Sequence, residues 1–295
     1  SIGVCLFNDD RLDEALKVFT DLASNCEHRP TRVEAMFQAA RTHRQVGSLG
    51  EFVRVMNSIV ESFPDHDLAP VALFELGSEL RSSGSLEQSA SAFERLTTDY
   101  PDSAQADDAQ YQLAMIAVQS ERPNRAIEIV DALVQRFPDS DLHTSALVLK
   151  AASLARIGKT EKALKLLQDL LASREGEERI LVSLEYADLL YTLDKYSEAL
   201  QLYADATETA VDEWAARAEF GSGRCLRALG RSEDALDHFM NVVLAYPSSV
   251  KRDDAILNAS EILVEKKEYE RAIKLLKLHS DESRADKRIE RIKRL

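Results

Sequence analysis

The chain contains 295 residues, carries a formal net charge of −14, and is 45% apolar. This acidic balance argues against nucleic acid as the main partner, because binding phosphates needs a positively charged surface. No run of about 20 apolar residues is present, so the sequence predicts no membrane-spanning helix. Glycine, proline and aromatic residues are scarce, as expected of a chain made mostly of helices.

One helical segment, residues 124–138 (NRAIEIVDALVQRFP), shows the pattern that the rest of the chain repeats. Ala126, Val130, Leu133 and Phe137 fall on one stripe of a helix, and Pro138 ends the helix because it lacks a main-chain donor. The segment is therefore predicted to be an amphipathic helix with a defined end.

The helix recurs with a nearly constant period along the whole chain. Taking Ala126 as an anchor, the equivalent positions are Ala15, Phe52, Ser89, Ala126, Ala163, Ala199, Ala235 and Ala272. By subtraction, the steps between them are 37, 37, 37, 37, 36, 36 and 37 residues. A period this regular indicates a repeat protein.

Two further columns accompany the anchors. The residue four positions after each anchor is a large apolar one: Phe19, Met56, Phe93, Val130, Leu167, Tyr203, Phe239 and Leu276. The residue twelve positions before each anchor is small: Gly3, Ala40, Gly77, Ala114, Ala151, Ala187, Gly223 and Ser260. A small residue lets a neighbouring helix approach, and a bulky one fills the space opposite. Each period therefore predicts a pair of packed helices.

The spacing within a repeat resembles the tetratricopeptide repeat family. The residues that carry the resemblance in the third repeat are Leu73, Leu76, Gly77, Leu80, Ser89, Phe93 and Pro101. Leu stands where the family has Trp and Tyr, Ser stands for its Ala, and the period exceeds the usual 34 residues. The resemblance implies an all-α, right-handed superhelical solenoid of about eight antiparallel helix pairs.

The loops after several second helices narrow the resemblance further. The phrases FPDHD, YPDSAQ, FPDSD and YPSS resemble the bacterial subgroup of envelope-assembly lipoproteins and TolA-binding proteins. This subgroup implies a location in the bacterial cell envelope or periplasm, with the cytoplasm as the alternative. The repeats beginning near Ala163 and Ala199 depart from it, because Glu175 and Val211 replace the terminal proline.

The repeat pattern sets the expected domain boundaries. Residues 1–279 are predicted to form one repeat array, and residues 280–295 a charged capping helix or the start of a further repeat. Gly3 already occupies the small-residue column, so we expect the first helix to begin upstream of Ser1 and the chain to be a fragment. A protein with a half-length first helix is the alternative.

The turn inside each repeat is predicted five residues before the anchor. Gly47, Gly84, Gly158 and Gly230 lie there, where positive φ is often required. The corresponding residues of the other repeats are Asp10, Glu121, Asp194 and Lys267.

The sequence offers no candidate for catalysis. The three cysteines, Cys5, Cys26 and Cys225, lack metal-site or redox spacing. The six histidines form no HxxxH pair, and GSGRCLRALG, residues 221–230, lacks the last glycine of a phosphate-binding loop. We therefore expect no enzyme, no metal and no cofactor.

The functional prediction concerns a surface. In the tetratricopeptide family, first helices line a concave groove that binds peptides, and we define the inner stripe as the positions 15, 11 and 8 residues before each anchor. The candidate groove residues are Phe37, Arg41, Arg44, Phe74, Arg81, Tyr111, Met115, Tyr191, Arg224 and Arg227. The Lys and Asn clamp by which cochaperone relatives bind a carboxyl terminus is missing, so a segment with acidic residues flanking an apolar core is expected instead. The alternative is that the arginines pair with Glu34, Glu75 or Asp108.

Two main hypotheses follow from this surface. The chain is a protein-interaction module that binds a partner segment in the groove, or it is a scaffold or self-associating subunit that docks through its convex face or its ends. A regulatory domain of an enzyme with an upstream catalytic part is a third alternative. The sequence does not identify the partner.

Overall fold

A computed structural model describes residues 2–294, apart from the side chain of Glu282, and in this part of the chain the only regular elements are α-helices. The chain divides into two compact units, residues 1–149 and 150–295, with the division inside one helix, α9 (His143–Arg156). Within each unit the helices pack mainly against their neighbours in sequence, as expected of a repeat array. The all-α repeat fold predicted from the sequence is thereby confirmed.

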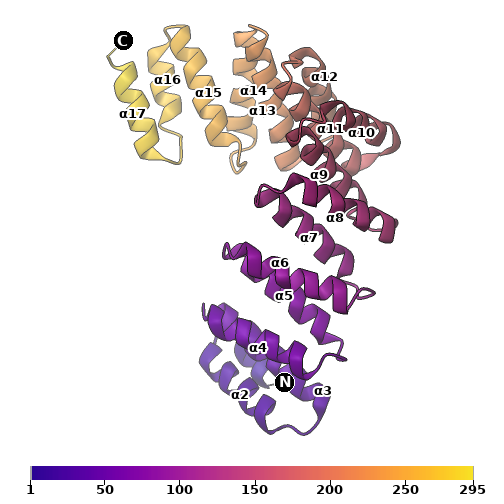
Figure 1. Ribbon diagram of the computed structural model, residues 1–295. Coiled ribbons are helices and arrows are strands. Elements are labelled where there is room, and N and C mark those ends of the chain that lie inside the picture. The colour runs from indigo at the N-terminus through magenta and orange to yellow at the C-terminus, as the bar shows by residue number, and fades with distance from the viewer. Residues whose placement is uncertain (1, 295) are drawn as a thin grey trace. The chain divides into compact units, whose positions relative to one another are not determined.

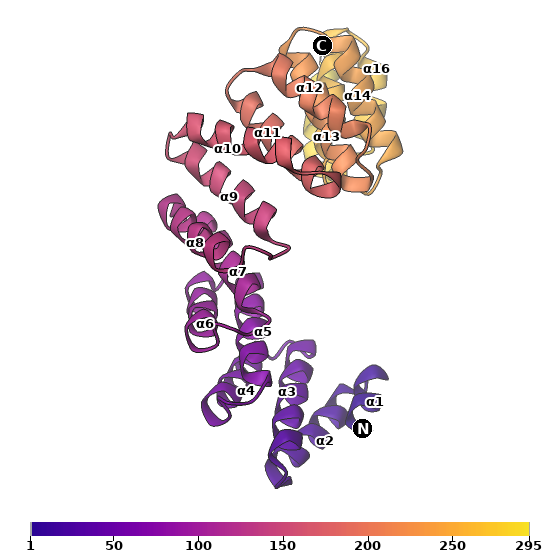
Figure 2. The same ribbon diagram turned by 90° about the vertical axis from the view of Figure 1, so that its right-hand side faces the viewer.

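The first unit contains the helices that precede α9, which Figures 1 and 2 show as successive antiparallel neighbours. Their bounds are α1 (Ile2–Asn8), α2 (Leu12–Asn25), α3 (Arg29–Gln45), α4 (Leu49–Ser62), α5 (Leu68–Ser82), α6 (Leu86–Asp99), α7 (Ala106–Gln119) and α8 (Pro123–Arg136).

The second unit contains the helices that follow α9. Their bounds are α10 (Thr160–Ser173), α11 (Gly176–Thr192), α12 (Tyr196–Thr207), α13 (Asp212–Ala228), α14 (Ser232–Ala245), α15 (Arg252–Glu265), α16 (Tyr269–Leu276) and α17 (Glu282–Ile292).

The anchor column forms the buried seam of each helix pair. All eight anchors have 0% of their surface exposed. One of them, Ser89, is polar, and its hydroxyl donates a hydrogen bond of 2.6 Å to the carbonyl of Gly77 on the partner helix. A buried hydroxyl is costly unless it is paired, so this bond explains how serine replaces alanine here.

Small and large residues meet, as the sequence predicted, across the helix pairs whose small residue is a glycine. A Cβ atom added to Gly77 would lie 2.8 Å from the Phe93 ring, and one added to Gly223 would lie 2.7 Å from the Phe239 ring. Both rings are completely buried. The glycines are therefore required by close packing between first and second helices, since any larger side chain would displace a core ring.

The turns between paired helices share one conformation. Gly47, Gly84, Gly158 and Gly230 have φ between +77° and +82°, and Asp10, Glu121, Asp194 and Lys267 have φ between 56° and 63°. In each turn, the amide that follows donates to the carbonyl five residues earlier, for example Ser85 to Leu80 at 2.8 Å. This is the Schellman ending of a helix, which satisfies carbonyls that the helix leaves unpaired.

Proline determines where several second helices end. Helices α4, α6, α8 and α14 each end two residues before a proline, with Phe63, Tyr100, Phe137 or Tyr246 between. Proline disfavours helical conformation in the preceding residue and lacks a donor for the helix itself.

The last helix, α17, packs against α16 and buries Ala285, Ile289 and Ile292. Its predecessor α16 has 8 residues, whereas most other second helices have 14. The buried positions of α17 repeat the spacing of Ala255, Ala259 and Ile262 on α15. Helix α17 thus has the buried pattern of a first helix, although it follows after a shortened repeat.

Candidate functional site

The inner stripe lies on the first helices of both units, and its members contact the neighbouring first helix. In the first unit, Nη1 of Arg44 on α3 lies 3.2 Å from Oε2 of Glu75 on α5. In the second unit, Arg227 on α13 reaches Glu261 on α15 at 2.8 Å. In each unit, an arginine of the stripe therefore reaches across to the first helix of the next repeat.

The aromatic members of the stripe in the first unit are largely covered. Phe37 is only 6% exposed and belongs to the core. Phe74 is half-buried, and its ring centre lies 5.7 Å from that of Phe93 in an edge-to-face arrangement; Tyr111 and Met115 are also half-buried. These side chains contribute to packing as well as to the surface.

The arginines of the first unit differ in their surroundings. Arg44 pairs with Glu75, and its guanidinium also lies 5.7 Å from the centre of the Phe52 ring. Arg41 is half-buried, and its Nε atom is shielded from solvent without a hydrogen-bond partner. Arg81 is half-buried as well. One of the three predicted arginines is thus compensated by a carboxylate that the sequence had offered as an alternative partner.

In the second unit, the inner stripe opens into a hollow of about 560 Å³, which we call the inner hollow. It brings together three of the candidate groove residues, Tyr191, Arg224 and Arg227, with Phe220, which lies 15 residues before its anchor and so also on the inner stripe, and with Ala228, Lys251, Asp254 and Asn258.

Arg224 is held in the inner hollow by aromatic rings. Its guanidinium carbon lies 3.8 Å from the centre of the Tyr191 ring and 6.0 Å from that of Phe220. Lys251 Nζ lies 5.7 Å from the same Phe220 ring. Neither cation forms an ion pair within residues 2–294. A stacked guanidinium keeps its N–H edge free, which suits it to a carboxylate.

Arg227 has a different role at the edge of the same hollow. It bonds to Glu261 at 2.8 Å and to Glu265 at 3.0 Å, and Glu261 also accepts from Arg288 of α17 at 2.7 Å. Burial alone disfavours the charged guanidinium, but the two carboxylates outweigh it and raise the pKa of Arg227. Its charge is therefore largely used inside the protein.

A half-buried polar network joins α11 to α12 and α13. Arg217 bonds to Glu185 at 2.8 Å and also to Asp188, which accepts a further bond from the Tyr203 hydroxyl. Burial, with the neighbouring charge of Asp188, raises the pKa of Tyr203. A fully paired network of this kind favours one relative position of the helices that carry Tyr191 and Arg224.

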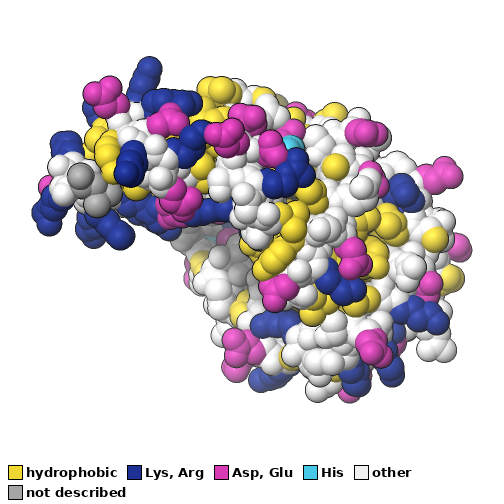
Figure 3. Space-filling view, turned by 90° about the horizontal axis from the view of Figure 1, so that it is seen from above, with side chains coloured by type: hydrophobic (Ala, Val, Ile, Leu, Met, Phe, Trp, Pro, Cys, Tyr) yellow, Lys and Arg dark blue, Asp and Glu magenta, His cyan; other side chains and the backbone are white. Residues whose placement is uncertain are grey.

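The charge on the surface of the second unit is unevenly distributed. Figure 3 shows Lys and Arg side chains gathered around the end of α17. The basic residues of this segment are Arg284, Lys287, Arg288, Arg291, Lys293 and Arg294. Although Arg288 pairs with Glu261, the other basic side chains make this end positively charged in a chain that is acidic overall.

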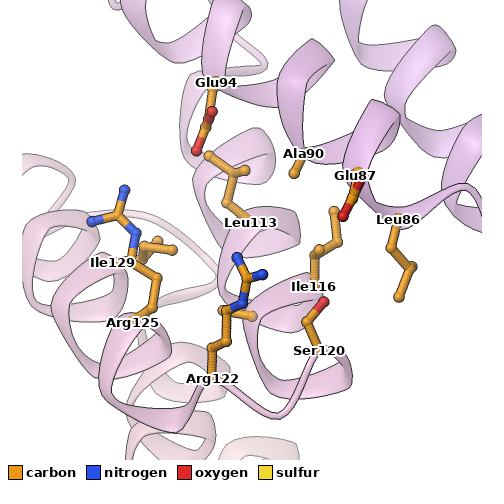
Figure 4. Close-up of a pocket in the computed structure, with 11 residues that line it drawn as sticks. Leu86, Glu87, Ala90, Glu94, Leu113, Ile116, Ser120, Arg122, Arg125 and Ile129 are labelled. Carbon is orange, nitrogen blue, oxygen red and sulfur yellow. The ribbon is translucent and has the colours of Figure 1, made fainter.

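A separate hollow of about 330 Å³ lies in the first unit between α6, α7 and α8, and we call it the outer hollow. Its apolar wall is formed by Leu86, Ala90, Leu113, Ile116, Ala117 and Ile129. Charged side chains surround it, with Glu87 and Glu94 from α6 on one side and Arg122 and Arg125 on the other (Figure 4).

Several residues that line the two hollows lie outside the inner-stripe positions. Lys251 and Asp254 lie at the start of α15, on the face turned toward α13 and outside the inner-stripe positions. Ala90 belongs to the column one residue after the anchor, where Val53 and Ile127 are larger. Comparing side-chain volumes along this column would have indicated the outer hollow.

Neither a candidate metal site nor a candidate membrane-spanning helix is found among the described residues. Between residues 2 and 294, no group of three or more His, Cys, Asp and Glu side chains could hold a metal ion. None of the helices in that range has both the length and the apolar character needed to cross a membrane.

Solved structures share this fold. A tetratricopeptide repeat protein from Parabacteroides merdae matches with a TM-score of 0.62 and 15% identity, over 88% of this chain and 98% of the other. The Cut9 and Hcn1 hetero-tetramer of the APC/C matches at 0.57 and 15%, over 95% and 52%. PilF of Pseudomonas aeruginosa matches at 0.53 and 16%, over 79% and 97%. At these identities the likeness shows the fold alone.

Comparison of the sequence with protein families identifies a family as well as a fold. No curated protein matches the chain significantly. The sequence model of the YfiO family, described as outer membrane lipoprotein, matches residues 66–269, which is more than half of the chain. A match of this extent, which covers helices α5 to α15, shows that the chain belongs to the YfiO family of tetratricopeptide-like outer membrane lipoproteins.

Proposed function

We propose that the chain is a non-catalytic interaction protein of the bacterial cell envelope that binds a segment of a partner protein on its inner stripe. The repeat fold supports protein binding in general, because stacked repeats present extended surfaces. The description of the family as outer membrane lipoproteins supports the envelope location.

The observation that carries the proposal is the state of Arg224 and Lys251 in the inner hollow. Both cations flank Phe220 without an ion pair in the described part of the chain, whereas Arg44 and Arg227 are paired. The preferred ligand is a segment with an acidic side chain for Arg224 and an apolar side chain beside it. Arginine and carboxylate form two parallel hydrogen bonds, which adds directionality to the charge attraction.

In the first unit, the proposed binding residues are Arg41 and Arg81, with Phe74, Tyr111 and Met115 as the apolar part. Arg44 is a weaker contributor because a ligand carboxylate would compete with Glu75. We therefore assign the selection of the acidic residue mainly to the second unit.

A photo-crosslinking experiment tests this assignment. A photoreactive amino acid is placed at Ala228, which lines the inner hollow, and at Asp237, which is exposed on α14 as a control. Crosslinks formed in the living cell are identified by mass spectrometry of the attached segment. We expect an adduct at position 228 that contains acidic residues, and none at position 237.

Two charge reversals complete the test. Arg224→Glu should remove the adduct, whereas Arg231→Glu should not, because the Arg231 side chain is exposed and pairs with nearby Asp234. Equal adducts at positions 228 and 237, or an adduct that survives Arg224→Glu, would contradict groove binding.

The scaffold alternative has its own structural support. Val211 and Val250 are 72% and 78% exposed, and Glu213 ties their loops together by accepting from the Ser249 hydroxyl at 3.1 Å. Docking away from the inner stripe would use exposed apolar residues of this kind, and these two valines are among the most exposed large apolar residues of the described chain. A photoreactive residue at Val250 that crosslinks when position 228 does not would favour the scaffold.

A further inference from the structure

The outer hollow is a local departure from the repeat. It lies between the second helices α6 and α8, with α7 as its floor, and its wall residues Leu113, Ile116 and Ile129 are less than 10% exposed. The residue one position after the anchor is Ala90 in α6, but Val53 in α4 and Ile127 in α8. The hollow exists because a side chain present in both neighbouring repeats has been reduced to a methyl group.

The rim of the outer hollow carries unused charge. Glu87 and Glu94 are exposed on α6, and their carboxylates form no ion pair in the described part of the chain. Arg125 pairs with Glu128 at 3.2 Å, whereas Arg122 on the same side has no ion pair among the described residues. Figure 4 shows the Arg122 side chain extending toward Leu113 and Ile116.

The spacing of the acidic residues indicates the geometry of a ligand. Glu87 and Glu94 are seven residues apart on one helix, or about 10.5 Å along its axis. A ligand helix lying along α6 would present residues i and i+7 at the same spacing. An extended strand would place same-face residues at about 6.6 or 13 Å, which fits poorly.

We infer that the outer hollow is a second protein-binding site, which takes an amphipathic helix from a partner protein. The helix would insert large apolar side chains between α6 and α8. Lys or Arg residues at i and i+7 would face Glu87 and Glu94, and an acidic residue on its other edge would meet Arg122. This site is distinct from the inner stripe and does not depend on it.

Two synthetic peptides serve as the probe. Each is a hydrocarbon-stapled helix with two Leu residues on one face. The first carries Lys at i and i+7 along one edge and Glu along the other, and the second has the Lys and Glu positions exchanged. Binding to the full chain is measured by fluorescence anisotropy. The first peptide should bind about threefold to tenfold more tightly, because exposed charge pairs contribute modestly.

Filling the hollow gives the decisive variant. Ala90→Ile should weaken the first peptide about tenfold or more, since the burial of a large apolar side chain is lost. The variant should fold normally because Ile127 and Val53 occupy the equivalent positions, and circular dichroism checks this. Val53→Ile on α4 is the matched control and should leave binding unchanged.

Reversing the rim charge tests the direction of binding. Glu87→Lys with Glu94→Lys should reverse the preference, so that the second peptide binds more tightly. Equal binding of the two peptides, or no effect of Ala90→Ile, would overturn the inference. A dimer of the chain alone that dissociates on Ala90→Ile, seen by sedimentation velocity, would instead identify a second copy as the occupant.

Discussion

Gly77→Ala tests whether the small-residue column determines how closely the paired helices pack. Gly77 lies inside α5, and its added Cβ would be 2.8 Å from Cε1 and Cζ and 2.9 Å from Cε2 of Phe93. Three ring atoms at this distance cannot all be accommodated by rotating one bond, and the ring is 0% exposed. Either the ring or the helix must move.

Two opposing effects determine how much Gly77→Ala changes the free energy of unfolding. Alanine is favoured over glycine in a helix by about 1 kcal/mol. Overpacking a well-packed core costs about 1 to 3 kcal/mol. The net free energy of unfolding should therefore fall by up to about 2 kcal/mol, even though the new residue is the better helix former.

Gly50→Ala is the matched control, because Gly50 is exposed in the first turn of α4 and an added Cβ would meet no atom within 4 Å. This variant should be neutral or more stable by up to about 1 kcal/mol. Stability is measured by urea unfolding and by native-state hydrogen exchange of α5 and α6, which reports opening of the local pair.

A double-mutant cycle with Phe93→Leu isolates the contact. The smaller side chain should reduce the cost of Gly77→Ala, giving a favourable coupling of about 1 kcal/mol or more. If Gly77→Ala stabilises the protein as Gly50→Ala does, or if the coupling is zero, the reasoning from close packing is refuted.

Two further predictions concern a turn and a buried thiol. Glu121 has φ of 56°, a conformation that glycine adopts without strain. Glu121→Gly should therefore raise the free energy of unfolding by about 0.5 to 1 kcal/mol, while Gly84→Ala in the equivalent turn should lower it. Denaturation midpoints of the two variants that move in the same direction would contradict this prediction. Burial raises the pKa of the Cys225 thiol from 9.0 to about 11. Between these two pH values the unfolded chain binds fewer protons than the folded chain. The free energy of unfolding should therefore fall as pH rises from about 9 to about 11. Cys225→Ala should flatten that part of the pH profile, and an unchanged slope would exclude the thiol as its cause.

The repeat fold could be predicted from the sequence because its determinants are local or strictly periodic. The role of each repeat position is set by neighbours at a fixed separation in the sequence. This holds for anchors such as Ala126, for the glycines opposite Phe93 and Phe239, and for the turn residues Gly84 and Glu121. A position that is buried in one repeat is buried in the next, so eight copies of the pattern reinforce each other. The prolines further allowed the ends of several second helices to be predicted.

The candidate sites could be predicted only in part. The inner-stripe rule found Tyr191, Phe220, Arg224 and Arg227, since residues at i, i+4 and i+7 share one helix face. It gave no means of deciding which arginines are neutralised. Arg44 and Glu75 are 31 residues apart, and Arg227 and Glu265 are 38 apart, so their pairing depends on how successive helices are rotated against each other.

The sequence by itself determined the all-α repeat architecture, the helix pairs, the turns and the face on which binding was expected, because each follows from side-chain size and backbone preference at a regular spacing. Only the tertiary structure decided that Lys251 joins Arg224 in one hollow and that Ala90 leaves another open between α6 and α8. The physical reason is that charge pairing and empty volume depend on distances between side chains of different helices. A periodic pattern fixes which face a side chain occupies, but not what stands opposite it.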